Sequence, residues 1–428
     1  MTARAWMAGL AALALVAPPI ASAQVAASPA PALPSVEALA QRYVATGRAP
    51  GIAIALGGAG DTRFVAKGVL SDGGAPATPD SLWRVYSMTK PITAMAAMML
   101  VEDGKLRLDQ PVSDFLPKFA KMRVLTDPEH GLASRPAARP ITIRHLLTHT
   151  AGLGYTIVTK GPLLHEYERL GIVPAAVNAK VEAEMLRVRP KSLAEFADRL
   201  ATLPLIADPG SRWSYSVGLD LMGRVIEVAS GMSFERFLQT RMFGPLGMTS
   251  TYWQVPPDQA GRLATNYVFV GDRAVPFDPG ATSIFLQAPS FPYGGAGLVS
   301  SARDYDRFLH MLQNRGTLDG KRVMKPETVA LAMSNLLPAG VTFGGVDAST
   351  GGTAGPKMGF GAGGSVTLED APGGLGRGTY AWGGAAGTLA FVDPGRQLRG
   401  TVMVNYFPAD RWPLRADLTR ALMTDLAR

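Results

Sequence analysis

The two ends of this chain carry the same pattern, a pair of β-type runs about a tight turn. One pair lies within residues 51–71, and the other lies within residues 387–407 about Asp393-Pro394-Gly395. Between them the apolar periodicity is mostly helical, and we expect helices over the following ranges: 89–103, 142–148, 192–201 (with Ser192 and Glu195 as a capping box), 217–229 and 411–428. Because tight hairpins pair their strands antiparallel, the pattern predicts an α+β fold, an α/β sandwich. Its antiparallel sheet uses both chain ends and is flanked by helices, with a mostly helical region inserted at about residues 105–260.

Composition excludes several classes of protein. The chain has 428 residues, 47% of them hydrophobic, which is enough for a large buried core. It has no cysteine, so disulfides, thiolate catalysis and cysteine-based zinc sites are excluded. The net charge is +8, but the 42 Lys and Arg residues are scattered and form no basic run with interleaved aromatics. We therefore expect no nucleic-acid partner.

The first residues are typical of an export signal. Arg4 precedes an apolar run over residues 8–17 that is too short to span a bilayer, and Ala21-Ser22-Ala23 forms a cleavage site. Residues 1–23 are therefore predicted to be a signal peptide, with a retained anchor as the weaker alternative. Residues 24–35 follow as a flexible mature N-terminus, and 36–428 as one enzyme domain without a membrane span. This predicts a periplasmic or secreted protein.

The tetrapeptide Ser87-Met88-Thr89-Lys90 has the spacing of a nucleophile and its base. If Ser87 opens a helix, Lys90 falls one turn later on the same face, and Pro91 is tolerated in the first turn. A serine hydroxyl needs a neighbouring base to become a nucleophile, and a helix N-terminus favours a developing oxyanion. The alternative is an ordinary helix start with one solvated charge. A lone match of this kind can be accidental, so other motifs must support it.

Other hydrolase designs find no support. The chain has no Gly-x-Ser-x-Gly, the nucleophile elbow of α/β-hydrolases. His145 and His149 share a helix face, but no glutamate follows the first, so the metalloprotease motif is absent. We interpret both histidines as structural, each a satisfied polar group at a helix end. No metal and no organic cofactor is predicted.

Four motifs in order resemble a known group of enzymes. They are Ser87-Met88-Thr89-Lys90 with its apolar helix, residues 141–153 ("ITIRHLLTHTAGL"), residues 209–231 ("PGSRWSYSVGLDLMGRVIEVASG") and residues 380–388 ("YAWGGAAGT"). Together they resemble the serine β-lactamase and penicillin-binding-protein superfamily. Within it the chain is most similar to the class C β-lactamase-like branch and, there, to family VIII carboxylesterases. The resemblance runs from about residue 36 to 428 and implies a β-lactamase/transpeptidase-like fold.

The resemblance implies roles for individual residues. Ser87 would be the acylated nucleophile, Lys90 would help to deprotonate it, and Tyr215 would act as general base. The backbone N–H groups of Ser87 and Ala385 would form the oxyanion hole. The segment Trp382-Gly383-Gly384 would line the site from an edge strand.

Two departures from the β-lactamase pattern bear on the substrate. Val217, in Tyr215-Ser216-Val217, replaces an asparagine that holds the substrate amide, and Trp382 replaces a lysine that binds a carboxylate. Loss of that charge favours uncharged substrates. We therefore expect hydrolysis of small-molecule carboxylic esters, with weak β-lactamase activity. Substrate contacts are expected from Trp382, Gly383, Gly384, Ser216 and Val217.

The sequence leaves alternatives open. One is a β-lactamase or D-amino-acid peptidase, another an acyltransferase or amidase of the same fold, and a third a non-catalytic binding protein. Residues 155–190 and 277–301, which lie between the motifs, are expected to shape the acyl or alcohol pocket. Tyr293-Gly294-Gly295 either borders the site or forms a simple turn. The glycine-rich residues 344–364 are expected to form a loop that runs into a strand.

Overall fold

A computed structural model describes residues 32–345 and 357–427. The predicted signal peptide (1–23) and most of the predicted flexible segment (24–31) lie outside the described residues, as does the centre of the glycine-rich stretch (346–356). That stretch enters a strand at residue 358.

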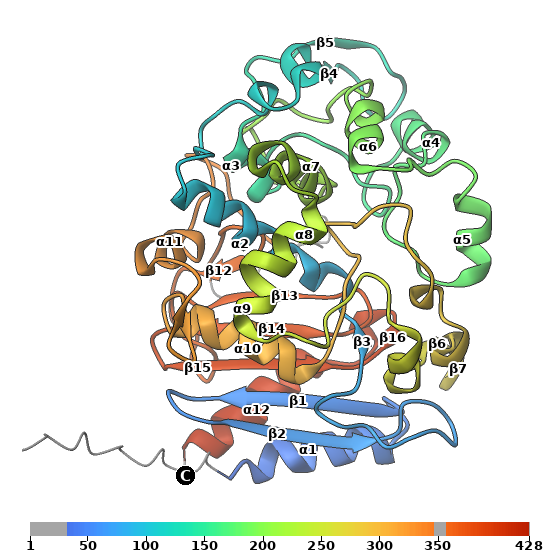
Figure 1. The fold of residues 1–428 in the computed structure, drawn as a ribbon, viewed down its shortest axis with the longest axis vertical. Helices are drawn as coiled ribbons and strands as arrows, with labels where there is room; N and C mark the ends of the chain where they lie inside the picture. Colours follow the sequence, from blue (N-terminus) through green and yellow to red (C-terminus); the bar gives the residue numbers. More distant parts are fainter. Residues whose placement is uncertain (1–31, 346–356, 428) are drawn as a thin grey trace, which may run out of the picture.

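The principal sheet is antiparallel and joins the two ends of the chain, as predicted (Figure 1). Its order is β11-β12-β13-β14-β15-β1-β2. In chain order the strands are β1 (Gly51–Gly57), β2 (Thr62–Gly68), β11 (Met358–Phe360), β12 (Ser365–Thr367), β13 (Tyr380–Gly383), β14 (Leu389–Asp393) and β15 (Leu398–Met403). The contact between the ends is the β1–β15 pair, with Ala53 opposite Met403 and Gly57 opposite Arg399.

Helices cover both faces of this sheet. α1 (Pro34–Ala45) packs with α12 (Leu414–Leu426) on one face, and α10 (Ala302–Gln313) packs against β1 and β15 on the other. All of β1 is buried, and its side chains alternate between two cores because successive strand residues point to opposite faces. The larger residues Ile52, Ile54 and Leu56 join the α1–α12 core, whereas Ala53 and Ala55 join the larger core that contains α2 (Thr89–Glu102).

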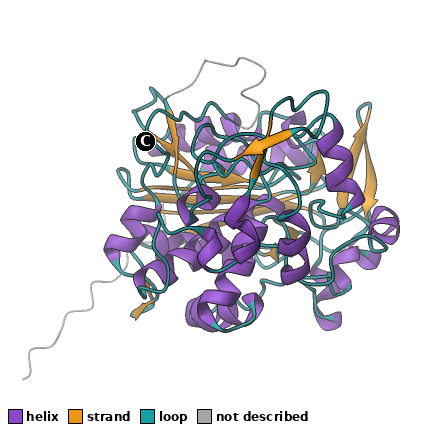
Figure 2. Cartoon of the chain, turned by 90° about the horizontal axis from the view of Figure 1, so that it is seen from above, coloured by secondary structure: helices purple, strands orange, loops and turns teal. Residues whose placement is uncertain are grey.

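The remaining elements are helices and small strands, and Figure 2 shows the helices gathered along the band of strands. The helices are α3 (Ile143–Leu147), α4 (Pro162–Arg169), α5 (Ala179–Met185), α6 (Leu193–Leu200), α7 (Gly218–Ser230), α8 (Phe234–Leu238), α9 (Gly244–Leu246) and α11 (Pro326–Ala332). The small strands are β3 (Trp83–Arg84), β4 (Arg123–Leu125), β5 (Ser134–Pro136), β6 (Asn266–Val270), β7 (Arg273–Asp278), β8 (Val299–Ser300), β9 (Thr317–Leu318), β10 (Lys321–Arg322) and β16 (Tyr406–Phe407). Among the described residues, no helix has both the length and the apolar character needed to cross a membrane.

Helix starts follow the side chains that cap them. Thr142 caps α3 by accepting from the His145 N–H, and His145 Nδ1 accepts from the Thr142 N–H, so His145 is the structural residue that was predicted. Ser192 caps α6 through the Glu195 N–H. Only half of the predicted capping box forms there, because the Glu195 carboxylate accepts instead from the N–H of Lys191.

A buried ion pair ties β3 to the end of β7. The Arg84 guanidinium donates to the Asp278 carboxylate, with Nε at 2.8 Å from Oδ2, and both side chains are almost completely buried. Removing one partner would leave an uncompensated buried charge, so Asp278→Ala is expected to lower the free energy of unfolding by roughly 3–5 kcal/mol. Urea unfolding measures this. The matched control is Asp272→Ala, which removes the exposed partner of Arg411 and should leave stability unchanged; equal losses in the two variants would contradict the expectation.

Candidate active site

The serine and lysine of the tetrapeptide lie at the start of α2. A short 3-10 turn over Tyr86–Met88 leads into the helix, so Ser87 lies just before it and Lys90 in its first turn. Lys90 is fully buried, because nearly every side of α2 packs into the core, whereas Ser87 remains partly exposed. Lys90 Nζ lies 3.3 Å from Ser87 Oγ, which is the contact that the spacing predicts.

Tyr215 reaches the same hydroxyl from a distant part of the chain. It precedes α7, and its phenolic oxygen lies 2.8 Å from Ser87 Oγ across a separation of 128 residues. Lys90 Nζ lies 4.6 Å from the centroid of the Tyr215 ring. The serine hydroxyl therefore has two groups within reach that can exchange a proton with it.

Aromatic rings hold Tyr215 in place. The ring centroids of His149 and Trp382 lie 4.9 and 5.8 Å from that of Tyr215, and Trp213 stacks on it at 6.1 Å with an interplanar angle of 9°. Tyr155 adds an edge contact at 5.3 Å. A phenol fixed on several sides presents its hydroxyl in one direction, which suits a proton-transfer group.

His149 has a larger part in this packing than a polar group at a helix end. Its Nδ1 lies 2.9 Å from Ser216 Oγ, and burial lowers the pKa of its imidazole well below the usual range, with the Lys90 charge adding to the effect. The ring is therefore neutral at working pH. No partner for its Nε2 is found in the described part of the chain.

The third motif approaches Ser87 through β13. Trp382 packs on Tyr215, and a Cβ placed on Gly384 would lie 2.4 Å from the carbonyl oxygen of Val85, just before Ser87. The next residue, Ala385, lies in the following turn, and its N–H makes no backbone hydrogen bond within the described ranges. The N–H groups assigned to an oxyanion hole thus belong to neighbouring segments.

The prediction of an edge strand for this motif is wrong. Two further strands, β12 and β11, lie beyond β13 in the sheet. The pairing of β12 with β13 covers only Tyr380 and Ala381, however, so Trp382 and Gly383 extend past it. Because β12 is short, Trp382 and Gly383 have no strand partner on that side, although β13 is not the outermost strand of the sheet.

We expect Gly384→Ala to lower ester turnover by at least about tenfold. The added methyl group would push the turn away from the Val85 carbonyl, and so away from the backbone of Ser87 that follows it. The measurement is kcat/KM on a p-nitrophenyl ester. Gly261→Ala is the control, since a Cβ at that glycine meets nothing within 4 Å. Equal activity in the two variants would count against close packing of the turn on the nucleophile.

Ser216 and Val217, which were expected to contact substrate, are buried more deeply than Tyr215. Both side chains are almost fully buried, and the Ser216 hydroxyl is taken up by His149 Nδ1 and by the Gly218 N–H at 3.3 Å. Their direct contact with a substrate stays a prediction.

The loop that contains Tyr293-Gly294-Gly295 borders the site beside Lys90. The Gly295 carbonyl accepts from Lys90 Nζ at 2.7 Å, and the Gly294 carbonyl accepts from the Thr93 hydroxyl at 2.7 Å. Both interpretations given for this loop hold, since it is a turn, closed by the Gly297 N–H donating to the Tyr293 carbonyl at 3.1 Å, and it also borders the site. Asp220 on α7, which the sequence analysis missed, accepts from the Gly295 N–H at 2.8 Å. The signal for Asp220 was available, since it is a lone charge in the apolar run that follows Tyr215.

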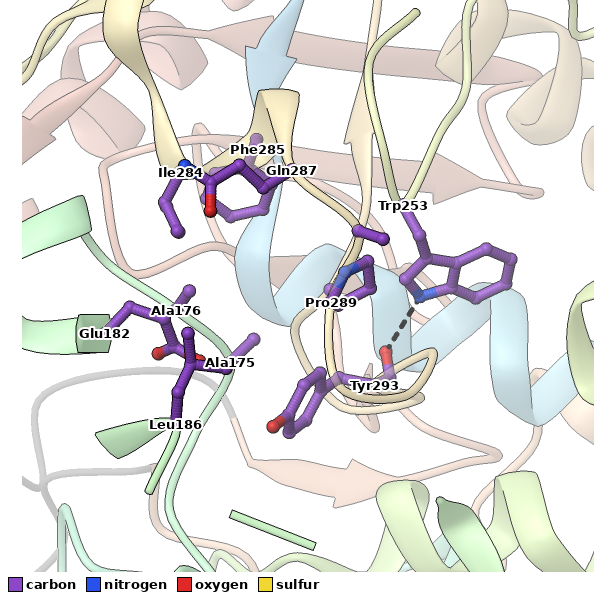
Figure 3. Close-up of a pocket in the computed structure, with 12 residues that line it drawn as sticks. Ala175, Ala176, Glu182, Leu186, Trp253, Ile284, Phe285, Gln287, Pro289 and Tyr293 are labelled. Carbon is purple, nitrogen blue, oxygen red and sulfur yellow. Dashed lines mark hydrogen bonds between the residues drawn. The ribbon is translucent and has the colours of Figure 1, made fainter. Parts of the chain in front are cut away.

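On its far side the same loop closes a small pocket (Figure 3). Residues 175–186 form one wall, and residues 284–297 with Trp253 form the other. These stretches fall within the two segments that the sequence analysis expected to shape a pocket. The Trp253 indole N–H points to the Tyr293 carbonyl at 3.4 Å, which fixes the loop from this side. The lining is mostly apolar.

Comparison with known proteins places the chain among serine hydrolases and acyl-transferring enzymes. The chain belongs to the Beta-lactamase family, which it matches over residues 36–423. Esterase EstB of Burkholderia gladioli is 34% identical, covering 78% of this chain and 80% of that protein, and a lovastatin esterase of Penicillium rubens is 33% identical, covering 84% and 88%. The solved structure of EstCE1, a hydrolase with promiscuous acyltransferase activity, is 26% identical with a TM-score of 0.74, covering 91% of this chain and 98% of that one. The predicted superfamily and fold are thus confirmed, and esterases are among its relatives.

Proposed function

We propose that this protein is a serine hydrolase that cleaves carboxylic esters through an acyl-enzyme on Ser87. The observation that supports this best is the convergence of Tyr215 and Lys90 on one hydroxyl, at 2.8 and 3.3 Å. A serine so placed can lose its proton as it attacks, which a solvated serine cannot do.

The reaction follows from these contacts. Ser87 Oγ attacks the ester carbonyl while its proton passes to the Tyr215–Lys90 pair. The N–H groups of Ser87 and Ala385 stabilise the oxyanion, an interaction for which one donor is worth roughly 3 kcal/mol. The pair then returns the proton to the departing alcohol. A water molecule repeats the sequence on the acyl-serine and releases the acid.

The uncharged side chain of Trp382 favours esters over β-lactams as substrates. The residue places a buried indole against Tyr215, where the related β-lactamases have a lysine for a substrate carboxylate. The small pocket beside Tyr293 has a mostly apolar lining, which suits part of an uncharged ester better than a carboxylate. We propose it as the acyl or alcohol pocket. We also propose that nitrocefin is hydrolysed, because the acylation residues are shared with β-lactamases, but only slowly, because Trp382 replaces the lysine that would bind its carboxylate.

We also propose that the protein is exported, with residues 1–23 removed. The support is the signal-type sequence before the enzyme domain. Intact mass of the protein recovered from the periplasm or medium tests this, and recovery of the full-length chain only from the cytoplasm would contradict it.

The test of the enzymatic function uses wild-type protein on p-nitrophenyl butyrate and on nitrocefin, with and without an added alcohol. Peptide mass spectrometry after a fluorophosphonate probe locates the labelled residue. Fast ester turnover and a single adduct on Ser87 are expected. Nitrocefin turnover far above ester turnover would make a β-lactamase the better description. Transfer to the alcohol in preference to water would indicate an acyltransferase, and no turnover with no adduct would contradict a catalytic role.

A further inference from the structure

Asp220 is a buried carboxylate next to the candidate site that the reaction above leaves without a role. It lies on α7, shortly after Tyr215, and is 4% exposed. Its Oδ1 accepts from the Gly295 N–H at 2.8 Å, and the carbonyl of the same glycine accepts from Lys90 Nζ at 2.7 Å. One residue of the loop therefore connects the carboxylate to the amine that contacts Ser87.

The fit of this connection is tight. A Cβ placed on Gly295 would lie 2.5 Å from Asp220 Oδ2, so any larger residue would push the loop and the carboxylate apart. The close approach sets the position of the Gly295 carbonyl. That carbonyl in turn fixes Lys90 Nζ, because it accepts the shorter of two hydrogen bonds that the amine donates, at 2.7 Å against 3.3 Å for the bond to Ser87 Oγ.

Lys90 is the cation that is available to balance the negative charge of Asp220. Four charged or titratable groups face it: Lys90, Arg189, Tyr155 and Tyr293. Arg189 is already paired with Glu182, at 2.6 Å and with both side chains buried. Lys90 forms no ion pair within 4.0 Å in the described part of the chain. Burial raises the pKa of Asp220, and Lys90 is the largest influence that opposes this rise.

We propose that Asp220 is a positioning residue: through Gly295 it holds Lys90 against Ser87, and its negative charge favours proton uptake by the Lys90–Tyr215 pair. The proposal rests on the ester-cleaving function above. Asp220 contacts no reacting atom, so its effect should appear in the pH dependence of the reaction more than in substrate binding. A negative charge nearby makes proton uptake easier, so its removal should move the acid limb of the pH profile to lower pH.

The test compares wild type with Asp220→Asn, which keeps an oxygen acceptor for the Gly295 N–H and removes the charge. Two quantities are measured against pH: kcat/KM for p-nitrophenyl butyrate and the rate at which a fluorophosphonate labels Ser87. The acid limb of both profiles is expected to move down by roughly one pH unit. KM should change little. The matched control is Asp304→Asn, a buried carboxylate whose pKa is also raised by burial and which accepts from the Ser250 N–H at 2.6 Å; its profiles should match wild type.

Unchanged profiles in a folded Asp220→Asn protein would overturn the proposal, because the carboxylate would then be packing only. If that variant does not fold, Gly295→Ala decides the question. It keeps the charge but displaces the carbonyl, so Ser87 labelling should slow at least tenfold with the acid limb unmoved, and labelling at the wild-type rate would overturn the proposal. Failure of the ester function is separate: wild type would label at Ser87 without hydrolysing esters, and the labelling profiles would still decide the role of Asp220.

Discussion

Ser87→Ala is expected to abolish ester turnover, with kcat falling by roughly 10⁴-fold or more. The reason is that the acyl-enzyme needs the serine oxygen, and neither Lys90 nor Tyr215 can replace it as the attacking atom. The loss should appear in kcat for p-nitrophenyl butyrate. The fluorophosphonate adduct should disappear from the intact mass at the same time.

The control for this substitution is Ser233→Ala, which removes an exposed serine that caps α8. It is expected to keep the turnover and the adduct, with only the modest loss of stability that an absent cap causes. Retained ester turnover in Ser87→Ala would mean that another residue carries the acyl group, and the proposed function would have to be rebuilt around it.

Tyr215→Phe is expected to lower kcat by roughly 10²- to 10⁴-fold while the protein folds normally. The variant removes the oxygen that lies 2.8 Å from Ser87 Oγ and keeps the ring that packs against His149 and Trp382. KM should change less than kcat, because proton transfer is made in the transition state and adds little to substrate binding. Steady-state kinetics with a thermal melt as a folding check provide the measurement.

The control for Tyr215→Phe is Tyr43→Phe, which removes a phenolic hydroxyl far from the candidate site. Tyr43 donates to Asp417 at 2.8 Å in the α1–α12 layer, so Tyr43→Phe also removes one hydrogen-bonded phenol. Its kcat should equal that of wild type. If Tyr215→Phe behaved as Tyr43→Phe does, Lys90 alone would have to accept the Ser87 proton.

Much of the fold could be predicted because its signals are local. Each hairpin at a chain end was predicted from two short β-runs with a turn between them. In the structure these runs pair as β1–β2 and β14–β15. The helix predicted from residue 89 begins there, since Pro91 is compatible with a first turn and the following residues are apolar. The interior position of β13 in the sheet was not predictable, because its outer neighbours β12 and β11 are short strands beside a glycine-rich stretch with weak periodicity.

Some contacts of the candidate site could likewise be predicted from the sequence, and others could not. By itself the sequence determined that Ser87 and Lys90 lie one turn apart at the start of a helix, because side chains three residues apart in such a turn are neighbours. The resemblance to a family added Tyr215 and Trp382 as candidates, without distances. Only the tertiary structure decided that the Tyr215 oxygen reaches Ser87, that Gly295 holds Lys90 and that Asp220 lies behind Gly295. Those contacts join segments far apart in the chain, and their lengths depend on how α2, α7 and the loop of Gly295 pack together.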